Sequence, residues 1–306
     1  MNTSVRTLAN PTAGVSAPSS VDTRDRARPG ALSHVITLAT QEIRIGLRNR
    51  WVLATTVLMA TLALSLALLG SAPVGTVKAD PLAVTVVSLA SLTIFLVPLI
   101  ALLLSFDAIV GEHERGTLML LLSYPLARWQ VVVGKSLGQM VILAVATLIG
   151  YGAAGVALGL QHGIAAGTWS AWLAMMGTSI LLGAAFIALG CLASTLVRER
   201  ATAAGLAIGL WLFFVLIYDS ALLGLLVADQ GRMISQQLLH ILLLLNPADA
   251  YRLFNMTGSE AVALYSGMAG PGDPATLPPG AFLLALLAWI ALPLAAAIAI
   301  FRKRAV

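Results

Sequence analysis

The 306-residue chain is 59% apolar and only 10% charged, and its mean hydropathy is +0.93. Soluble domains average about 45–50% apolar and about 25% charged residues, so this composition excludes a soluble globular protein. A single cysteine excludes a disulfide framework and a multi-cysteine metal site. The net charge is +5, and the distribution of the basic residues along the chain favours membrane topology over nucleic-acid binding.

The first 50 residues divide into two parts. Residues 1–32 are polar and rich in Ser, Pro and Arg, with no apolar run, which predicts a disordered cytosolic tail. In residues 33–50, apolar side chains recur at helical spacing from Ile36 to Leu47, and arginines fall on the other faces. This pattern predicts an amphipathic helix in the membrane interface. A cytosolic helix packed on a partner is the alternative.

Six apolar segments follow, and each is long enough for the roughly 20 helical residues that cross a bilayer core. Their approximate bounds are 51–70, 82–106, 131–160, 172–197, 203–227 and 281–301. The sequence therefore predicts an all-α integral membrane protein with a six-helix transmembrane domain at 51–301. Residues 302–306 form a basic cytosolic end.

Lys and Arg are distributed unevenly between the two sides of these spans. With the N-terminus in the cytosol, 15 of the 18 lie on the cytosolic side, and only Lys78, Arg232 and Arg252 lie outside. Because basic residues are enriched on the cytosolic side of membrane proteins, both termini are predicted to be cytosolic.

The largest extracytoplasmic segment is predicted at residues 228–280. Its apolar stretch, 233–245, has 13 residues and is too short to span a bilayer. We therefore expect a re-entrant or interfacial helix there. Asn246-Pro247 ends it, because the residue before a proline disfavours helix.

A densely charged cytosolic connection follows the second predicted span. Residues 106–135 read FDAIVGEHERGTLMLLLSYPLARWQVVVGK: a charged turn, a short apolar helix, a proline break, and then Arg128 and Trp129, which suit the headgroup layer. A helix held along the membrane surface between two spans is a docking surface for a cytosolic partner. The alternative is a solvated loop that only completes the topology.

This connection resembles ABC-2-type transporter permeases, in which E-x-E-x-G-T-L, Leu-Leu-Ser-x-Pro, an Arg and a Gly-Lys pair follow one another. The resemblance implies a type V-like permease fold and a non-catalytic subunit. Its coupling helix, at about 107–128, would contact a separate ATPase subunit that binds ATP and Mg²⁺. The residues that it implicates in coupling are Asp107, Glu112, His113, Glu114, Arg115, Gly116, Thr117 and Arg128.

A closer resemblance covers about residues 35–306, and it is strongest at 106–135, at 243–262 and at Tyr265 to Met268. It is to the permeases of the Nos copper-processing ABC transporter, which serves maturation of nitrous oxide reductase. It implies a bacterial inner-membrane location, a NosF-like ATPase, a periplasmic NosD-like protein and a second copy of the chain. The predicted contacts with the periplasmic partner are Asn246, Tyr251, Arg252 and Tyr265. An ABC-2 exporter of a lipid or hydrophobic compound is the alternative.

Other candidate sites carry less weight. Gly134-Lys135-Ser136 matches the end of a phosphate-binding loop, but that loop needs a glycine where Trp129 stands, so no nucleotide site is expected in this chain. The extracytoplasmic His and Met residues form no compact cluster, so no metal site is predicted. Asp219, inside the fifth predicted span, is either functional or a hydrogen-bonded residue near the outer end of a shorter span. An intramembrane enzyme would require Asp219, Asp107 or His162 to meet in one cavity.

Overall fold

The computed structural model describes residues 31–69, 81–124, 126–162, 166–229, 235–257 and 277–303, and in these ranges the regular secondary structure is helical. The long helices are α2 (Arg50–Leu69), α3 (Pro81–Ser105), α6 (Arg128–His162), α7 (Ala166–Leu196) and α13 (Pro279–Lys303). The others are α1 (Ala31–Leu47), α4 (Val110–Glu114), α5 (Thr117–Ser123), α8 (Arg200–Leu212), the π-helix η1 (Phe213–Ile217), α9 (Tyr218–Asp229), α10 (Gln236–Leu244) and α11 (Pro247–Thr257).

The helices confirm an all-α membrane architecture. Among the described residues, five helices are long and apolar enough to cross a bilayer, and α1 with α2 forms a sixth candidate that is bent by 70°. The predicted first span coincides with α2, which is apolar on all sides, whereas α1 is amphipathic. The two helices therefore suit different environments, and the chain bends between them.

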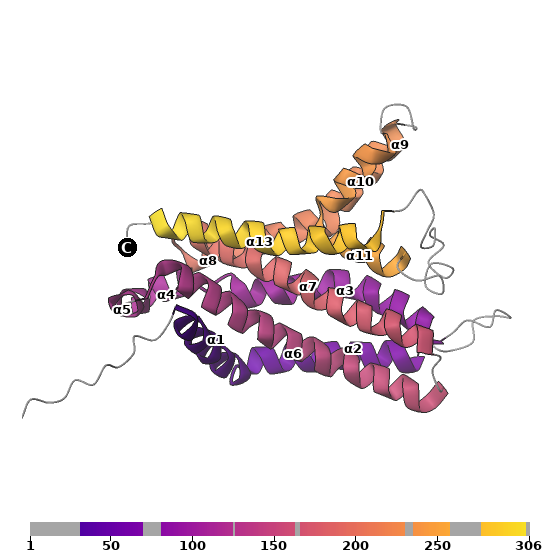
Figure 1. The fold of residues 1–306 in the computed structure, drawn as a ribbon, viewed down its shortest axis with the longest axis horizontal. Helices are drawn as coiled ribbons and strands as arrows, with labels where there is room; N and C mark the ends of the chain where they lie inside the picture. The colour runs from indigo at the N-terminus through magenta and orange to yellow at the C-terminus, as the bar shows by residue number, and fades with distance from the viewer. Residues whose placement is uncertain are drawn as a thin grey trace, which may run out of the picture.

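The core of the bundle is built around α7, which packs against α3, α6 and α13 (Figure 1). Small residues make the close approach possible: a Cβ on Gly183 would collide with Leu143 of α6, and one on Gly190 would collide with Ser105 of α3. Buried hydroxyls are paired within this core, for example Thr93 with Tyr151 at 2.7 Å. The long helices therefore form one tightly interlocked unit.

The fifth predicted span contains a π-helical turn and has the least buried apolar window of the five continuous spans in the described residues. It runs as α8, η1 and α9 over Arg200–Asp229, and its middle turn is π-helical. Only 11% of its most apolar window is buried, compared with 78% for the window in Trp169–Leu196. In Figure 1, α9 leaves the side of the bundle together with α10. The predicted span at 203–227 lies within this continuous helix, and the π-helical turn was not predicted, because all of its residues are apolar.

The segment after the fifth span folds into two helices. The first, α10, lies within the predicted apolar stretch, and its N-cap Ser235 accepts a hydrogen bond from the backbone N–H of Leu238. The second, α11, was not predicted. Pro247 stands at its first position, where a helix needs no N–H donor, and the side chain of Asn246 accepts from the backbone N–H of Ala248 at 3.0 Å. Asn246-Pro247 therefore ends one helix and also begins the next.

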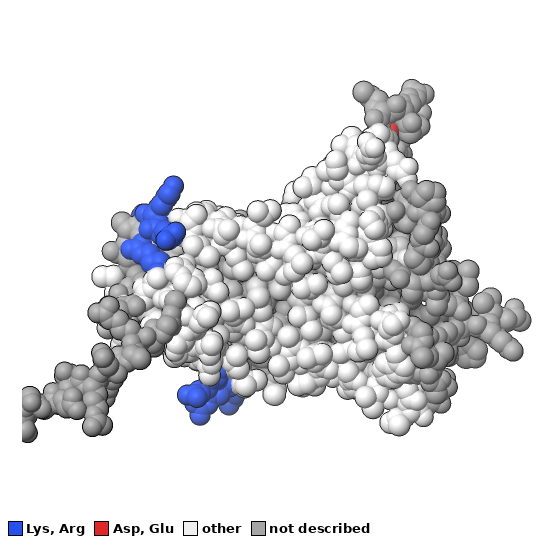
Figure 2. Space-filling view, in the orientation of Figure 1, with Lys and Arg blue, Asp and Glu red and all other residues white. Residues whose placement is uncertain are grey.

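Basic side chains gather at one end of the molecule. Figure 2 shows the Lys and Arg of this face at the end where α1, α5 and the C-terminal end of α13 lie in Figure 1. This is the end to which the sequence assigns the cytosol.

Candidate functional site

The predicted coupling region, 107–128, contains two short helices separated by a glycine. Gly116, between α4 and α5, has a φ of 72°, a left-handed conformation that glycine adopts without steric cost. The backbone N–H groups of Ile109 and Val110 both donate to Ser194 Oγ of α7 at 3.0 Å. Leu118 of α5 is 2% exposed and belongs to a buried cluster with α1, α6 and α13. The region is thus attached to the bundle at both helices.

Glu112 lies against Lys135, a residue of α6 that is 7% exposed. Its Oε1 is 2.7 Å from Lys135 Nζ, and Glu42 of α1 holds the same ammonium at 3.2 Å. Gln139 adds a 3.3 Å hydrogen bond to Glu42. One buried cation therefore joins α1, α4 and α6. The lysine that completed the phosphate-loop match in the sequence is held by two carboxylates.

Glu114 and Asp107 contact the start of the fifth span. The backbone N–H of Arg200 donates to Glu114 Oε1 at 2.6 Å, and its guanidinium forms an ion pair with Asp107 Oδ2 at 2.9 Å. The same guanidinium lies 5.8 Å from the ring centre of Phe106. Asp107 and Glu114 therefore fix the first turn of α8 relative to the coupling region.

The exposed surface of the coupling region combines large apolar side chains of α5 with polar and charged neighbours. Met119 and Leu120 of α5 are 62% and 68% exposed, and Tyr124 is 68% exposed. His113, Arg115 and Thr117 are exposed beside them. Arg128 lies apart: it donates to the carbonyl oxygens of Phe301 at 3.0 Å and Arg302 at 3.3 Å, and so caps the last turn of α13.

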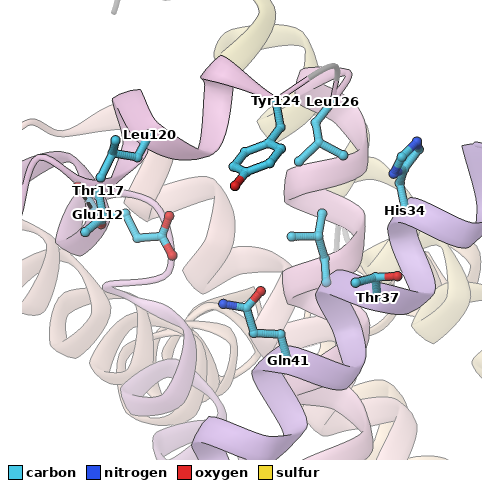
Figure 3. A pocket seen from close by; sticks show the side chains of 9 residues that line it. His34, Thr37, Gln41, Glu112, Thr117, Leu120, Tyr124 and Leu126 are labelled. Atoms are coloured by element: carbon cyan, nitrogen blue, oxygen red, sulfur yellow. Dashed lines mark hydrogen bonds between the residues drawn. The ribbon is translucent and has the colours of Figure 1, made fainter. Parts of the chain in front are cut away.

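A cavity of about 600 Å³ opens between α1 and the coupling region. Thr37 and Gln41 of α1, Glu112 of α4 and Tyr124 after α5 surround it, as Figure 3 shows. Its lining mixes aliphatic and polar groups, which suits a protein side chain better than a highly charged ligand.

A second charged cluster joins α9 to α11. Arg252 Nη1 and Nη2 donate to the two carboxylate oxygens of Asp219 at 2.7 Å, and Arg252 also pairs with Asp249. Asn246 donates to Asp249 Oδ2 and to the carbonyl oxygen of Phe214, both at 2.9 Å. Burial raises the pKa of Asp249 to about 7 despite the attraction of Arg252, and the nearby Asp219 adds to the rise. The cluster has one cation for two carboxylates, so the deeper carboxylate of Asp249 binds a proton more readily than an exposed one.

The structure separates the four residues that were predicted to contact a periplasmic partner. Asn246 and Tyr251 are fully buried, and the Tyr251 hydroxyl lies 3.1 Å from Ser179 Oγ of α7. We therefore remove both from the candidate surface, because a buried side chain cannot reach a partner. Arg252 is 31% exposed within its ion pairs. Tyr265 lies outside the described residues.

The acidic residues of the proposed intramembrane enzyme do not meet. Asp107 pairs with Arg200 at one end of the fifth span, and Asp219 pairs with Arg252 nineteen positions along it. Such a helical distance is about 28 Å. The His162 side chain lies outside what the structure describes.

The chain is similar to known membrane transport proteins. The model of the family described as ABC-2 family transporter protein matches residues 36–306. The chain is 47% identical over 276 residues to a probable ABC transporter permease protein NosY of Stutzerimonas stutzeri. The aligned region covers 89% of this chain and 99% of the relative. It is 48% identical over 272 residues to a protein of the same name from Pseudomonas aeruginosa, covering 88% of this chain and 98% of the relative.

Proposed function

The chain belongs to the ABC-2 family of transporter permeases, with the NosY proteins as close relatives, and on this premise we propose that it transmits force from a separate ATPase to an extracytoplasmic partner. It is an integral membrane protein. In this proposal it performs no catalysis, and ATP and Mg²⁺ bind to a NosF-like ATPase subunit.

The observation that carries the proposal is the exposed apolar surface of α5. Met119, Leu120 and Tyr124 are each more than half exposed, whereas the preceding Leu118 is buried. The surface lies at the basic end of the bundle, which is the cytosolic end by the positive-inside rule (Figure 2). Apolar side chains on a short helix at this end of the bundle fit a protein partner. The cavity beside α5 would receive a side chain of that partner.

Contacts within the chain support a role in transmission. The coupling region is tied to α6 by Lys135, to α7 by Ser194 and to α8 by Arg200. A force on α5 therefore reaches several long helices through direct ion pairs and hydrogen bonds.

The extracytoplasmic partner is proposed to be a NosD-like protein. The NosY relatives give the basis for assigning the complex to copper delivery in the maturation of nitrous oxide reductase, in a bacterial inner membrane. The outer surface of α10 is available for the contact, since Leu238 and Ile241 are 43% and 56% exposed. A second copy of the chain would pack on the fifth span, where a Cβ on Gly205 or Gly209 would have no neighbour within 4 Å.

The test is affinity purification of the tagged chain in mild detergent, with mass spectrometry of the proteins that accompany it. Leu120→Asp places a charge in the centre of the α5 surface and should lose the ATPase. Ala201→Asp places the same charge on the exposed first turn of α8 and should retain it. A wild-type chain that brings no ATPase would refute the proposed function.

The identity of the accompanying proteins also distinguishes the copper-processing complex from an exporter. An ATPase together with a periplasmic protein supports the copper-processing complex. An ATPase alone supports export of a lipid or hydrophobic compound. If Leu120→Asp keeps the ATPase and its stimulated activity, α5 is not the docking surface.

A Glu112→Lys variant tests the attachment behind that surface. It places a second ammonium beside Lys135, so α4 should separate from α6 while the long helices stay folded. We expect the ATPase to be lost or no longer stimulated. Normal stimulation would show that this ion pair is not needed for coupling.

A further inference from the structure

The fifth span packs on the bundle along one side only, where Ala207 and Phe214 are buried, and charged pairs hold both of its ends. Its most apolar window is only 11% buried, whereas that of Trp169–Leu196 is 78% buried. Exposed apolar side chains run along it, including Ile208, Phe213, Ile217 and Leu223. On its inner side, Trp211 Nε1 donates to the Phe95 carbonyl oxygen of α3 at 3.0 Å, and the Phe214 ring meets Phe186 and Trp289 edge-on. Because these contacts are fewer than those of α7, the span can move relative to the bundle with less repacking than α7 would need.

The inner end of this span is held by the coupling region. Arg200 is the first residue of α8. Its guanidinium pairs with the Asp107 carboxylate and lies against the Phe106 ring, and its backbone N–H donates to Glu114 Oε1. All three partners belong to the connection between α3 and α5. Any displacement of α4 therefore acts directly on the first turn of the span.

The outer end is held by the α10–α11 pair. Asp219 and Arg252 form a two-bond ion pair at 2.7 Å, the strongest geometry available to these groups. One residue earlier, the Tyr218 hydroxyl donates to the carbonyl oxygen of Leu242 in α10 at 2.7 Å. Both helices of the outer pair are thus attached to α9 by polar bonds.

The π-helix lies between the two attachments. A π turn accommodates an extra residue within a helix, and such turns occur frequently at functional sites. The carbonyl oxygen of Phe214 within it accepts a hydrogen bond from Asn246, the residue that joins α10 to α11. The irregular turn and the outer pair are therefore connected directly.

We propose that the fifth span, Arg200–Asp229, is the element that carries movement of α4–α5 to α10–α11, with Arg200 and Arg252 as the positioning residues at its two ends. The inference rests on the proposed function, since it needs an ATPase that moves α4–α5. A second copy packed on the exposed face would contact the span on one side only, so the span still moves relative to its own bundle.

The experiment is hydrogen–deuterium exchange of the full complex in nanodiscs, without nucleotide and with ATP plus vanadate. The readout is the nucleotide-dependent difference in exchange over 110–123 and over 236–257. Wild type should show a difference in both segments. Arg252→Gln and Arg200→Gln should keep the difference over 110–123 and lose most of it over 236–257. A merely structural role for Arg252 would raise exchange in both nucleotide states and leave their difference unchanged.

Matched variants act as controls. Ser220→Ala removes a neighbouring hydroxyl that donates to the carbonyl oxygen of Leu216, one turn earlier in the same span. Arg198→Gln removes an exposed arginine two residues before Arg200. Both variants should behave as wild type. Arg252→Lys keeps the charge without the two-bond geometry and should restore part of the response.

The outcomes distinguish the two levels of the argument. An unchanged response over 236–257 in both Gln variants overturns the inference and leaves the proposed function standing. A wild-type complex that responds at 110–123 but not at 236–257 does the same. A wild-type complex without a response at 110–123 overturns the proposed function and the inference with it.

Discussion

Replacement of Lys135 by Met tests how the coupling region is fixed to the bundle. The side chain is 9% exposed, and its ammonium lies 2.7 Å from Glu112 and 3.2 Å from Glu42. Methionine fills a similar volume but leaves both carboxylates without their cation. We expect α4 and α1 to loosen from α6 and the chain to lose stability.

The magnitude follows from the geometry. At an effective dielectric constant of about 20, unit charges at these separations attract by about 6 and about 5 kcal/mol. Removal of the three groups from water opposes this attraction with several kcal/mol for each ion. Breaking a buried pair costs about 3–5 kcal/mol, because the remaining charge is left desolvated. Glu112 and Glu42 keep 19% and 18% of their side-chain surface exposed, so we expect the lower end, about 3 kcal/mol.

The assay is unfolding by SDS in mixed micelles, with the free energy of unfolding compared between variants. Arg44→Met, which removes an exposed cation of α1, should change it little. The triple variant with Lys135→Met, Glu42→Gln and Glu112→Gln should recover most of the loss, because no unpaired charge remains. If Lys135→Met alone is as stable as wild type, or the triple variant is no better, the reasoning about this cluster is wrong.

Three further predictions concern the outer cluster, the core and the topology. The pKa of Asp249 is raised to about 7 in the folded chain, from about 3.9 in the unfolded chain. The folded state therefore binds the extra proton, and stability should fall as the pH rises from about 4 to about 7. Asp249→Asn should flatten this pH dependence of stability in SDS unfolding, and an unchanged dependence would assign it to other groups. Gly190→Ala should lower the free energy of unfolding by about 1–3 kcal/mol, because the new Cβ meets Ser105. Gly177→Ala, whose Cβ would have no neighbour within 4 Å, should be tolerated. Equal stability of the two variants would contradict the close packing of α3 and α7. A tag after Val306 should be labelled only after cells are permeabilised, and labelling of intact cells would reverse the topology.

The spans could be predicted because a single physical requirement defines them. A bilayer demands about 20 apolar residues in helical form, and the windows around α3, α6 and α13 satisfy it without ambiguity. The amphipathic pattern from Ile36 to Leu47 likewise falls within α1. In these segments the signal is local, so one sequence is enough to read it.

Elements and contacts that depend on tertiary partners could not be read in this way. Residues 247–257 contain Asp249, Arg252 and Asn255, and this polarity masks a helix that is stabilised by burial against α3, α7 and α13. Asp219 was recognised as unusual, but its partner lies 33 positions away in a helix that was not predicted. The proline at 247 was the available signal, since it opens a helix as readily as it closes one.

The acidic residues of the coupling motif also take a different place from the one that their pattern favours. Glu112 and Glu114 read as charges offered to a cytosolic partner, yet the structure directs the first to Lys135 and the second to the backbone of Arg200. A carboxylate held by an internal partner contributes to the position of α4, since its desolvation is compensated within the chain. The surface that remains for an ATPase is then the apolar side of α5, with His113 and Arg115 at its edge. The charged residues thus determine where α5 lies relative to the spans, and in the proposed function its apolar residues supply the contact with the ATPase.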